Sequence, residues 1–322
     1  MQQMTSFIPP HPLKTPVLFL VFNRLDTTKQ VFEAIRQARP PRIYVAADGA
    51  RVNKEDESEK IQAVRDHVMQ NIDWDCEVKT LFRDENLGCK YAVSGAITWF
   101  FENEEQGIIL EDDCLPSQSF FWFCEELLDR YKDDFRVWHI SGDNFQNGIK
   151  RGDASYYFSK FNHIWGWASW ADRWSHYDVE MSSFSQFKDD GLIASNFSEK
   201  KDQLYWLNVF DRTFNGEVDT WDYQWTYTVL SNSGLSILPN KNLISNVGFG
   251  ADATHTKDLD SLYSQISSTD LIMPLAHSRF CIFDVNADNY TSSQMFSKDN
   301  FLFRVFKKII RVFKKMIRGC NI

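Results

Sequence analysis

Two common nucleotide-binding signatures are absent from this sequence. The first apolar segment is not followed by G-x-G-x-x-G, the mark of dinucleotide-binding folds. The phosphate-loop motif G-x-x-x-x-G-K-[ST] occurs nowhere in the sequence. These absences disfavour a dinucleotide-dependent enzyme and a phosphate-loop enzyme. A nucleotide ligand, if there is one, must be held by other means.

Long hydrophobic runs and paired cysteines are also missing. No N-terminal signal sequence is visible, and the apolar segment Val17–Phe22 is too short to span a bilayer. The 6 cysteines show no C-x-x-C spacing, which predicts free thiols in a reducing compartment and a cytosolic protein.

The charge is unevenly distributed along the chain. The formal net charge is −9, yet residues 301–318 contain seven Lys or Arg and no acid, so the rest of the chain stands at −16. An acidic body does not suit nonspecific binding of nucleic acid, because the phosphate backbone repels it. We therefore expect no nucleic-acid partner.

The basic tail contains an internal repeat, residues 304–310 and then 311–317. At 100° per residue, a helix here would place its apolar side chains on one face and its basic side chains on the other. This pattern predicts a basic amphipathic helix on an anionic membrane surface, hence a peripheral protein at the cytoplasmic face of the inner membrane. Docking of the same helix on the acidic body or on a second protomer is the alternative.

The first 140 residues alternate strand and helix signals, which predicts an α/β fold with a mainly parallel sheet flanked by helices. We divide the chain into a nucleotide-binding half (1–144), an acceptor-side half of the same globule (145–300) and the tail helix (301–322). The expected strands are 17–22, 42–47, 77–82, 108–110, 137–140, 156–158, 235–239 and 243–247. The expected helices are 26–38, with Asp26 as the cap, 54–71, 89–104, 120–131, 199–214 and 222–231.

The most informative motif ends the fourth of these strands. The apolar run Ile108–Leu110 stops at Glu111, Asp112 and Asp113. Three carboxylates at the end of a buried strand repel one another unless a cation or water separates them, and hard oxygen ligands favour Mg²⁺ or Mn²⁺. In open α/β sheets ligands bind at the carboxyl ends of strands. The motif therefore predicts a metal–diphosphate site, with a solvated acidic turn as the alternative.

An ordered set of segments resembles the GT-A glycosyltransferases, and within them the inverting N-acetylglucosaminyltransferase I-like family, in its bacterial type. The resemblance covers about Pro16 to His255. The matching segments are PVLFLVFNR (16–24), VAADG (45–49), LEDDCLPSQSF (110–120), IWGWASWADRW (164–174), TWDYQW (220–225) and ISNVGFGADATH (244–255). Tyr223 departs from the family, which often has a second acid there.

The resemblance implies a role for each residue of the donor side. Asp113 would be the direct ligand of Mn²⁺ or Mg²⁺, Asp112 would reach the ribose hydroxyls, and Glu111 would hold a metal-bound water or a neighbouring donor group. Asp48 would accept hydrogen bonds from uracil, or simply form an Asp-Gly turn. Arg24 would pair with the diphosphate or brace the acids, or form only a surface ion pair.

On the acceptor side, Asp222 is the candidate base, taking the proton of the attacking hydroxyl. Its alternative is a helix cap, with Trp221 in the core rather than stacked on a sugar.

Three further predictions are less specific to the chemistry. Asp143 and Asn144 would contact the donor or acceptor, and Trp167 would pack or bind a sugar. His255 would complete the metal shell from a loop that closes over the donor, or be solvated.

Together these features predict a metal-dependent inverting glycosyltransferase. It would move a sugar from a UDP-sugar, such as UDP-GlcNAc, to a saccharide or lipid-linked oligosaccharide acceptor in surface polysaccharide or lipopolysaccharide synthesis. A retaining GT-A transferase or a nucleotidyltransferase is the alternative among enzymes, although Phe22–Leu25 is not the Gly- and Lys/Arg-rich loop of the latter. A catalytically silent saccharide-binding scaffold is the alternative outside enzymes.

Overall fold

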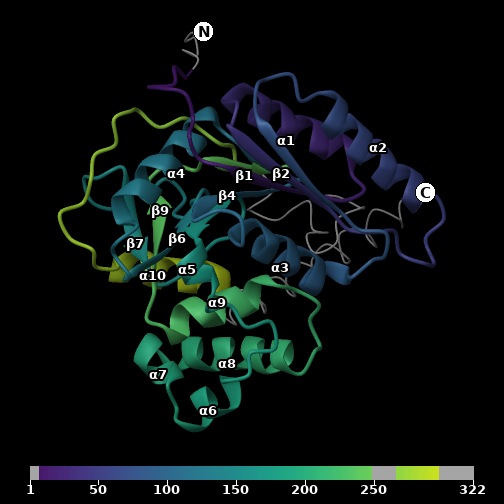
Figure 1. The fold of residues 1–322 in the computed structure, drawn as a ribbon. Helices are drawn as coiled ribbons and strands as arrows, with labels where there is room; N and C mark the ends of the chain where they lie inside the picture. The colour runs from purple at the N-terminus through teal and green to yellow at the C-terminus, as the bar shows by residue number, and fades with distance from the viewer. Residues whose placement is uncertain (1–6, 249–265, 297–322) are drawn as a thin grey trace, which may run out of the picture.

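Eight strands form one twisted sheet in this computed structural model, which describes residues 7–248 and 266–296. The strand order is β3-β2-β1-β4-β8-β6-β9-β7, and β5 pairs with β10 in a separate two-stranded sheet (Figure 1). The strands are β1 (Val17–Val21), β2 (Arg42–Ala47), β3 (Glu77–Phe82), β4 (Gln106–Glu111), β5 (Cys114–Pro116), β6 (Val137–Ser141), β7 (Tyr156–Ser159), β8 (Trp167–Trp170), β9 (Leu235–Pro239) and β10 (Ile244–Asn246).

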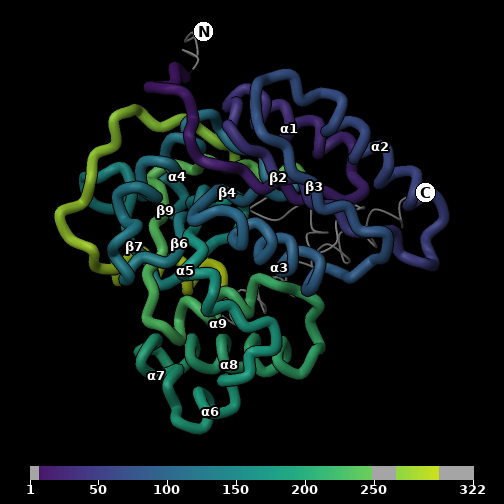
Figure 2. The backbone as a smooth tube through the Cα atoms, viewed as in Figure 1, coloured from purple at the N-terminus to yellow at the C-terminus, as the bar shows by residue number. Residues whose placement is uncertain are grey.

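Helices cover both faces of the sheet (Figures 1 and 2). They are α1 (Leu25–Ala38), α2 (Glu57–Gln70), α3 (Gly88–Phe101), α4 (Gln118–Tyr131), α5 (Ala171–Trp174), α6 (Phe184–Asp189), α7 (Ile193–Asn196), α8 (Lys200–Phe214), α9 (Asp222–Ser231), α10 (Val285–Thr291) and the π-helical turn η1 (Ser292–Phe296). The α/β fold class with a mainly parallel sheet is thereby confirmed.

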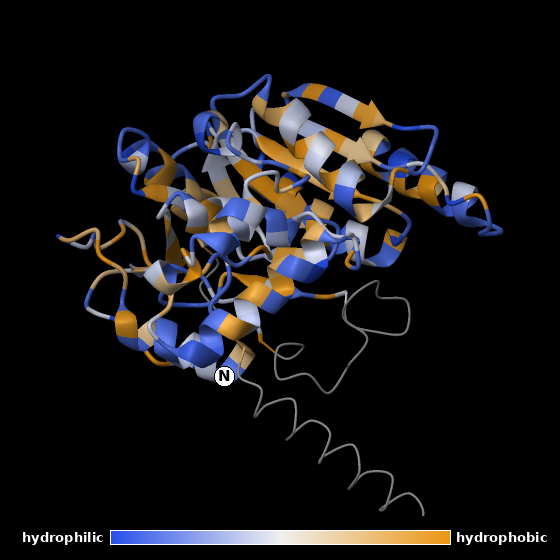
Figure 3. Cartoon of the chain, turned by 90° about the horizontal axis from the view of Figure 1, so that it is seen from below, coloured by the Kyte–Doolittle hydropathy of each residue, from blue (hydrophilic) through white to orange (hydrophobic). Residues whose placement is uncertain are grey.

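Alternation along the strands divides the core into two layers. In β1, Phe19 points to the face covered by α1, α2 and α4, whereas Leu18 and Leu20 point to the face covered by α3, α5 and α9. Both faces are buried, so the inner strands are apolar throughout, and Figure 3 shows hydrophobic strands between helices with hydrophilic outer faces. A third cluster joins α6, α7, α8 and α9 below the sheet.

The sheet is parallel on one side and mixed on the other. Strands β3, β2, β1 and β4 run parallel, β8 is antiparallel to both β4 and β6, and β7 is an antiparallel edge strand beside β9. The sheet takes strands from both sides of residue 144, and the boundary proposed there stays a prediction.

The sequence prediction needs correction at several elements. Strand β8 was not expected, because its tryptophan-rich segment has no alternation of polar and apolar residues. Helix α1 begins at Leu25 with Arg24 as its N-cap, so Asp26 lies in the first turn rather than at the cap. The stretch 250–300, expected to be loop-like, contains α10 and η1. The tail prediction for 301–322 lies outside the described residues.

Two further findings concern the cysteines and the helices. The described cysteines are free thiols. Among the helices of the described ranges, none has the length and apolar character needed to cross a membrane.

Candidate active site

The candidate site lies where the strand order reverses. From β1 the chain builds β2 and β3 on one side, and then returns to place β4 on the other side of β1. Leu20 of β1 pairs with Glu111 of β4, so the segments that follow these two strands leave the same edge of the sheet. A crevice outside the carboxyl ends of the strands at such a reversal is the usual ligand position in open α/β sheets.

An acidic cluster, Glu111, Asp112 and Asp113, occupies this edge together with Arg24. The Arg24 Nη2 donates a hydrogen bond to Asp112 Oδ1 and lies 2.9 Å from Asp113 Oδ2. Asp112 is only 4% exposed, and its second oxygen, Oδ2, is buried without a hydrogen-bond partner. One guanidinium therefore holds two of the three carboxylates, and an unsatisfied oxygen remains.

Burial, and to a smaller extent neighbouring negative charge, raises the pKa of two of these acids. Burial, and after it the charges of Asp113, Asp112 and Asp222, raises the pKa of Glu111 to about 8. Burial also raises the pKa of Asp112 to about 6, although Arg24 works against it. Three carboxyl groups thus share one guanidinium in a buried place.

The β5–β10 pair carries the chain from β10 over the acidic cluster. The Val247 amide donates to the backbone oxygen of Asp113 at 2.8 Å. A Cβ atom on Gly248 would lie 2.2 Å from Asp113 Oδ2 and 2.7 Å from Arg24 Nη1. Only a glycine fits here, because its backbone takes the space that a side chain would need.

Asp222 faces the same space from α9. It is the first residue of that helix, and Oδ1 accepts hydrogen bonds from the Thr220 hydroxyl and, at 3.0 Å, from the Tyr223 amide. Its charge contributes to the raised pKa of Glu111 and, after burial and Glu111, to that of Cys89. The structure therefore brings Asp222 close to the acidic cluster, although the two are far apart in sequence.

Asp48, at the end of β2, is engaged by the chain itself. Its carboxylate accepts hydrogen bonds from Asn86 Nδ2 (2.9 Å) and from the amides of Leu87 (3.0 Å) and Gly88 (3.2 Å). These bonds fix the start of α3. The contacts agree with a turn-forming role, and recognition of uracil by Asp48 stays a prediction.

Asp143 and Asn144 follow β6 at the same edge of the sheet. Asp143 accepts a hydrogen bond from the Trp165 amide at 3.3 Å, and burial raises its pKa well above the usual range. The Asn144 side chain donates to the Pro239 carbonyl at 2.6 Å and accepts from the Gln146 amide at 2.8 Å. Asn144 thus braces the neighbouring loops.

The two candidate tryptophans lie in the core. Trp167 is 1% exposed and Trp221 is 2% exposed, and their rings stack at 5.7 Å with an interplanar angle of 20°. These positions favour the packing interpretation that we offered as the alternative for each ring. The stack supports the N-terminus of α9, where Asp222 lies.

His255, predicted to complete the metal shell, lies outside the described residues. Within 7–248 and 266–296, no group of three or more His, Cys, Asp and Glu side chains is arranged to hold a metal ion. Mg²⁺ and Mn²⁺ commonly keep several waters and need only one or two carboxylates. The excess of acid, the unpartnered Asp112 Oδ2 and the small residue at 248 fit such an ion at Asp113.

Three contributors to the site were not foreseen. The Thr220 hydroxyl donates to Asp222, the Phe22 backbone acts to lower the pKa of Asp112 against the effect of burial, and Cys89 lies among the acids of the site. Thr220 could have been found as a hydroxyl residue two positions before the candidate base. No sequence signal identifies the other two.

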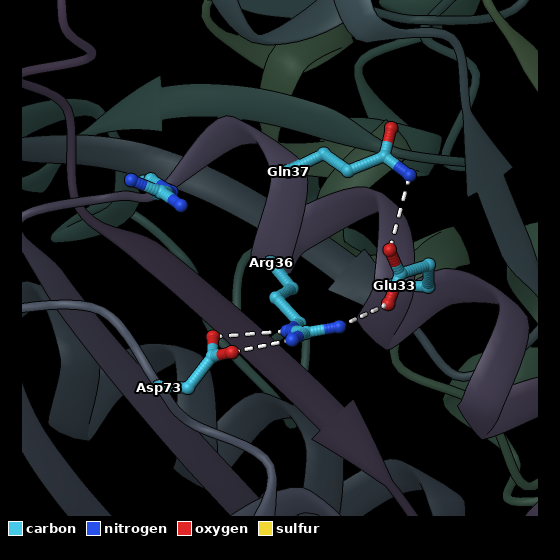
Figure 4. A pocket seen from close by; sticks show the side chains of 5 residues that line it. Glu33, Arg36, Gln37 and Asp73 are labelled. Atoms are coloured by element: carbon cyan, nitrogen blue, oxygen red, sulfur yellow. Dashed lines mark hydrogen bonds and ion pairs between the residues drawn. The ribbon is translucent and has the colours of Figure 1, made fainter.

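Two surface hollows lie elsewhere and contain no residue of the acidic cluster. One, of about 410 Å³, is lined by side chains of α1, by Arg39 just after it and by Asp73, and Figure 4 shows Arg36 pointing between Glu33 and Asp73. Arg36 Nε donates to Asp73 Oδ1 at 2.9 Å. The other, of about 610 Å³, includes Pro16 and Arg42 and lies at the amino ends of β1 and β2.

Comparisons with known proteins give no match among protein-family models or curated proteins. Among solved structures, the chain is similar to residues 1–349 of TarS from S. aureus, with 10% identity over 72% of this chain and 59% of that chain and a TM-score of 0.40. Mouse xyloside xylosyltransferase 1 gives 11% identity over 67% of this chain and 81% of that chain, with a TM-score of 0.34. A UDP-glucose pyrophosphorylase gives 8% identity over 73% of this chain and 93% of that chain, with a TM-score of 0.34. Likeness at this level does not decide the activity, which must be argued from the site.

Proposed function

We propose that this chain is a metal-dependent glycosyltransferase of the GT-A type that transfers a sugar from a UDP-sugar to a saccharide acceptor. The observation that carries the proposal is the acidic cluster at the reversal of strand order, with Arg24 opposite it. A diphosphate held through a divalent cation needs both kinds of group, carboxylates for the ion and a guanidinium for the phosphate oxygens.

On the donor side, Asp113 is the residue proposed to hold Mn²⁺ or Mg²⁺. When bound, the ion would supply Lewis-acid stabilisation of the charge on the departing nucleoside diphosphate. Glu111 and Asp112 flank the position, and Arg24 is within reach of the phosphate oxygens. A planar guanidinium can make two parallel bonds to a phosphate, which fixes the orientation of the donor.

On the acceptor side, Asp222 is proposed as the general base of an inverting displacement. Asp222 follows Trp221, whose ring stacks on Trp167, and its carboxylate accepts a hydrogen bond from the Thr220 hydroxyl, which orients it. It would accept the proton of the acceptor hydroxyl as that oxygen attacks the anomeric carbon. Such proton transfer contributes roughly 10²–10⁴ to the rate.

The finer parts of the proposal come from the sequence. They are membership of the N-acetylglucosaminyltransferase I-like family, a lipid-linked acceptor in surface polysaccharide or lipopolysaccharide synthesis, and contact of residues 301–318 with an anionic membrane. The position of His255 in the metal shell belongs with them. The seven basic residues of the tail, set against an acidic body, support the membrane part of the proposal.

The variant Asp222→Asn tests the catalytic part. We expect release of UDP from a panel of UDP-sugars, with a membrane lipid extract as acceptor, to fall at least about 100-fold. The affinity for UDP should stay within about threefold, because the amide keeps the size of the carboxylate. Asp219→Asn is the matched control, since Asp219 is exposed three residues earlier and bonds the Lys90 amide.

Two results would contradict this assignment. Unchanged turnover in Asp222→Asn would remove Asp222 as the base. Turnover absent from the parent protein, with saccharide binding retained, would favour the silent scaffold.

A further inference from the structure

The guanidinium of Arg24 lies against two of the three carboxylates of the acidic cluster. It contacts both Asp112 and Asp113, and the Asp113 oxygen that it approaches is the one nearest Gly248. Asp113 is also the residue proposed to ligate the ion. The same carboxylate oxygen cannot be fully engaged by a guanidinium and by a metal ion, because both draw on the same lone pairs.

We propose that Arg24 is an internal counter-ion that changes partner. Without a divalent cation it neutralises Asp112 and Asp113, and on cation binding it releases Asp113 and turns to the diphosphate of the donor. The proposal rests on the proposed function for its second half only. Its first half concerns the metal ion alone.

The backbone of Arg24 is fixed, whereas its side chain has room to turn. The Arg24 carbonyl accepts hydrogen bonds from the Thr28 amide at 3.0 Å and from the hydroxyls of Thr28 (2.6 Å) and Thr27 (3.2 Å). The side chain is 24% exposed, against 5% for Asp112 and 13% for Asp113. A rotation about the side-chain torsions therefore suffices, with no change in α1.

The charges explain why the exchange is favourable. Arg24 contacts two carboxylates, those of Asp112 and Asp113, and one guanidinium offsets a single negative charge. An ion with two positive charges offsets more, and the freed guanidinium then meets a ligand that brings new negative charge. The cation and the nucleotide should consequently bind cooperatively. The cation frees the Arg24 guanidinium to pair with the diphosphate, and the diphosphate gives the displaced guanidinium a new partner.

The variant Arg24→Gln tests the two halves of the proposal separately, because they predict opposite changes in affinity for Mn²⁺ and for UDP. Affinity for Mn²⁺ alone, measured by calorimetry without nucleotide, should rise at least about tenfold, since a competing positive charge is removed next to the ion. Affinity for UDP at saturating Mn²⁺ should fall at least about tenfold. A merely structural role for Arg24 would weaken both affinities together.

Two further variants keep the test decisive if Arg24→Gln folds poorly. Arg24→Lys preserves the charge but not the planar fork, so Mn²⁺ affinity should stay within about threefold of the parent while UDP affinity falls. In Arg24→Gln, Mn²⁺ should raise the melting temperature more than it does in the parent, because the ion replaces the lost counter-ion. Arg51→Gln is the matched control, since Arg51 pairs with Glu57 instead of the acidic cluster.

The outcomes divide clearly. Tighter Mn²⁺ binding in Arg24→Gln supports the exchange, even if UDP never binds and the proposed function fails. Weaker or unchanged Mn²⁺ binding in that variant overturns the exchange, whatever UDP does. Absence of Mn²⁺ binding in every variant overturns both the exchange and the metal site.

Discussion

The buried histidine of β6 gives a sharp prediction about acid stability. His139 is fully buried, its Nδ1 accepts a hydrogen bond from Trp225 Nε1 at 3.1 Å, and its Nε2 lies 2.8 Å from the His163 carbonyl oxygen. An indole N–H only donates and a carbonyl only accepts. The neutral ring with its proton on Nε2 therefore satisfies both partners, and a second proton on Nδ1 would face another donor.

The size of the effect follows from the pKa shift. Burial lowers the pKa of His139 to about 4, and burial together with the charge of His139 lowers that of His163 to about 3. Because the folded values lie below the unfolded value of about 6.5, the unfolded chain binds more protons in this range. Stability is fully present above pH 6.5 and is lost as pH falls, by about 2 kcal/mol per histidine between pH 7.5 and 5.0.

Buried carboxyl groups act in the opposite direction. The raised pKa of Glu111 and of Asp112 means that the folded state binds the extra protons, so these groups favour folding as pH falls. The stability of the parent protein alone would therefore mix two opposing effects. The difference in pH dependence between the parent and a histidine variant isolates one of them, because the carboxyl contributions cancel.

His139→Gln is the suitable change, since a glutamine amide can accept from Trp225 and donate to the His163 carbonyl. We measure the free energy of unfolding by urea denaturation at pH 7.5 and at pH 5.0. Relative to the parent, His139→Gln should gain about 2 kcal/mol of stability over this fall in pH, because it lacks the destabilising contribution of the histidine. Equal pH dependence in parent and His139→Gln would refute the reasoning.

Two other substitutions test the packing around the site. Gly248→Ala should weaken the binding of Mn²⁺ and UDP, measured by calorimetry, at least about tenfold, because its methyl group would overlap Asp113. Gly95→Ala in α3 is the control and should leave both affinities unchanged, because a methyl group there meets only the end of the Arg83 side chain, at 3.2 Å. Arg173→Leu should lower the unfolding free energy in urea by about 3 kcal/mol, because this buried side chain donates to backbone carbonyls, among them that of Lys132 at 2.8 Å. A loss below about 1 kcal/mol would show that water replaces those bonds.

Much of the sheet could be predicted from sequence because its strands are short, apolar and bounded by turn residues. The ranges of β2, β3 and β9 agree with the structure residue for residue. Strand β8 escaped prediction because four adjacent residues, Trp167–Trp170, face alternate core layers that are both apolar. No polar and apolar alternation remains to mark such a strand.

The grouping of the site was only partly predictable. From sequence, the acidic cluster could be placed at the end of a buried strand, with bracing of these acids as one of the roles expected of Arg24. Sequence reasoning could not place Gly248 over Asp113, since that contact depends on the β5–β10 pairing between distant segments. Nor could it show that the Asp48 carboxylate is occupied by the loop before α3, because the donors there are mainly backbone amides.

The most direct test of the central proposal is calorimetric titration of UDP into the purified protein, first with Mn²⁺ and then with EDTA. We predict binding with Mn²⁺ that is lost with EDTA and lost in Asp113→Ala, because the ion links that carboxylate to the diphosphate. Asp133→Ala, an exposed acid between α4 and β6, is the control and should bind as the parent does. Absence of UDP binding under every condition, or binding indifferent to EDTA and to Asp113→Ala, would contradict the proposed nucleotide-sugar site.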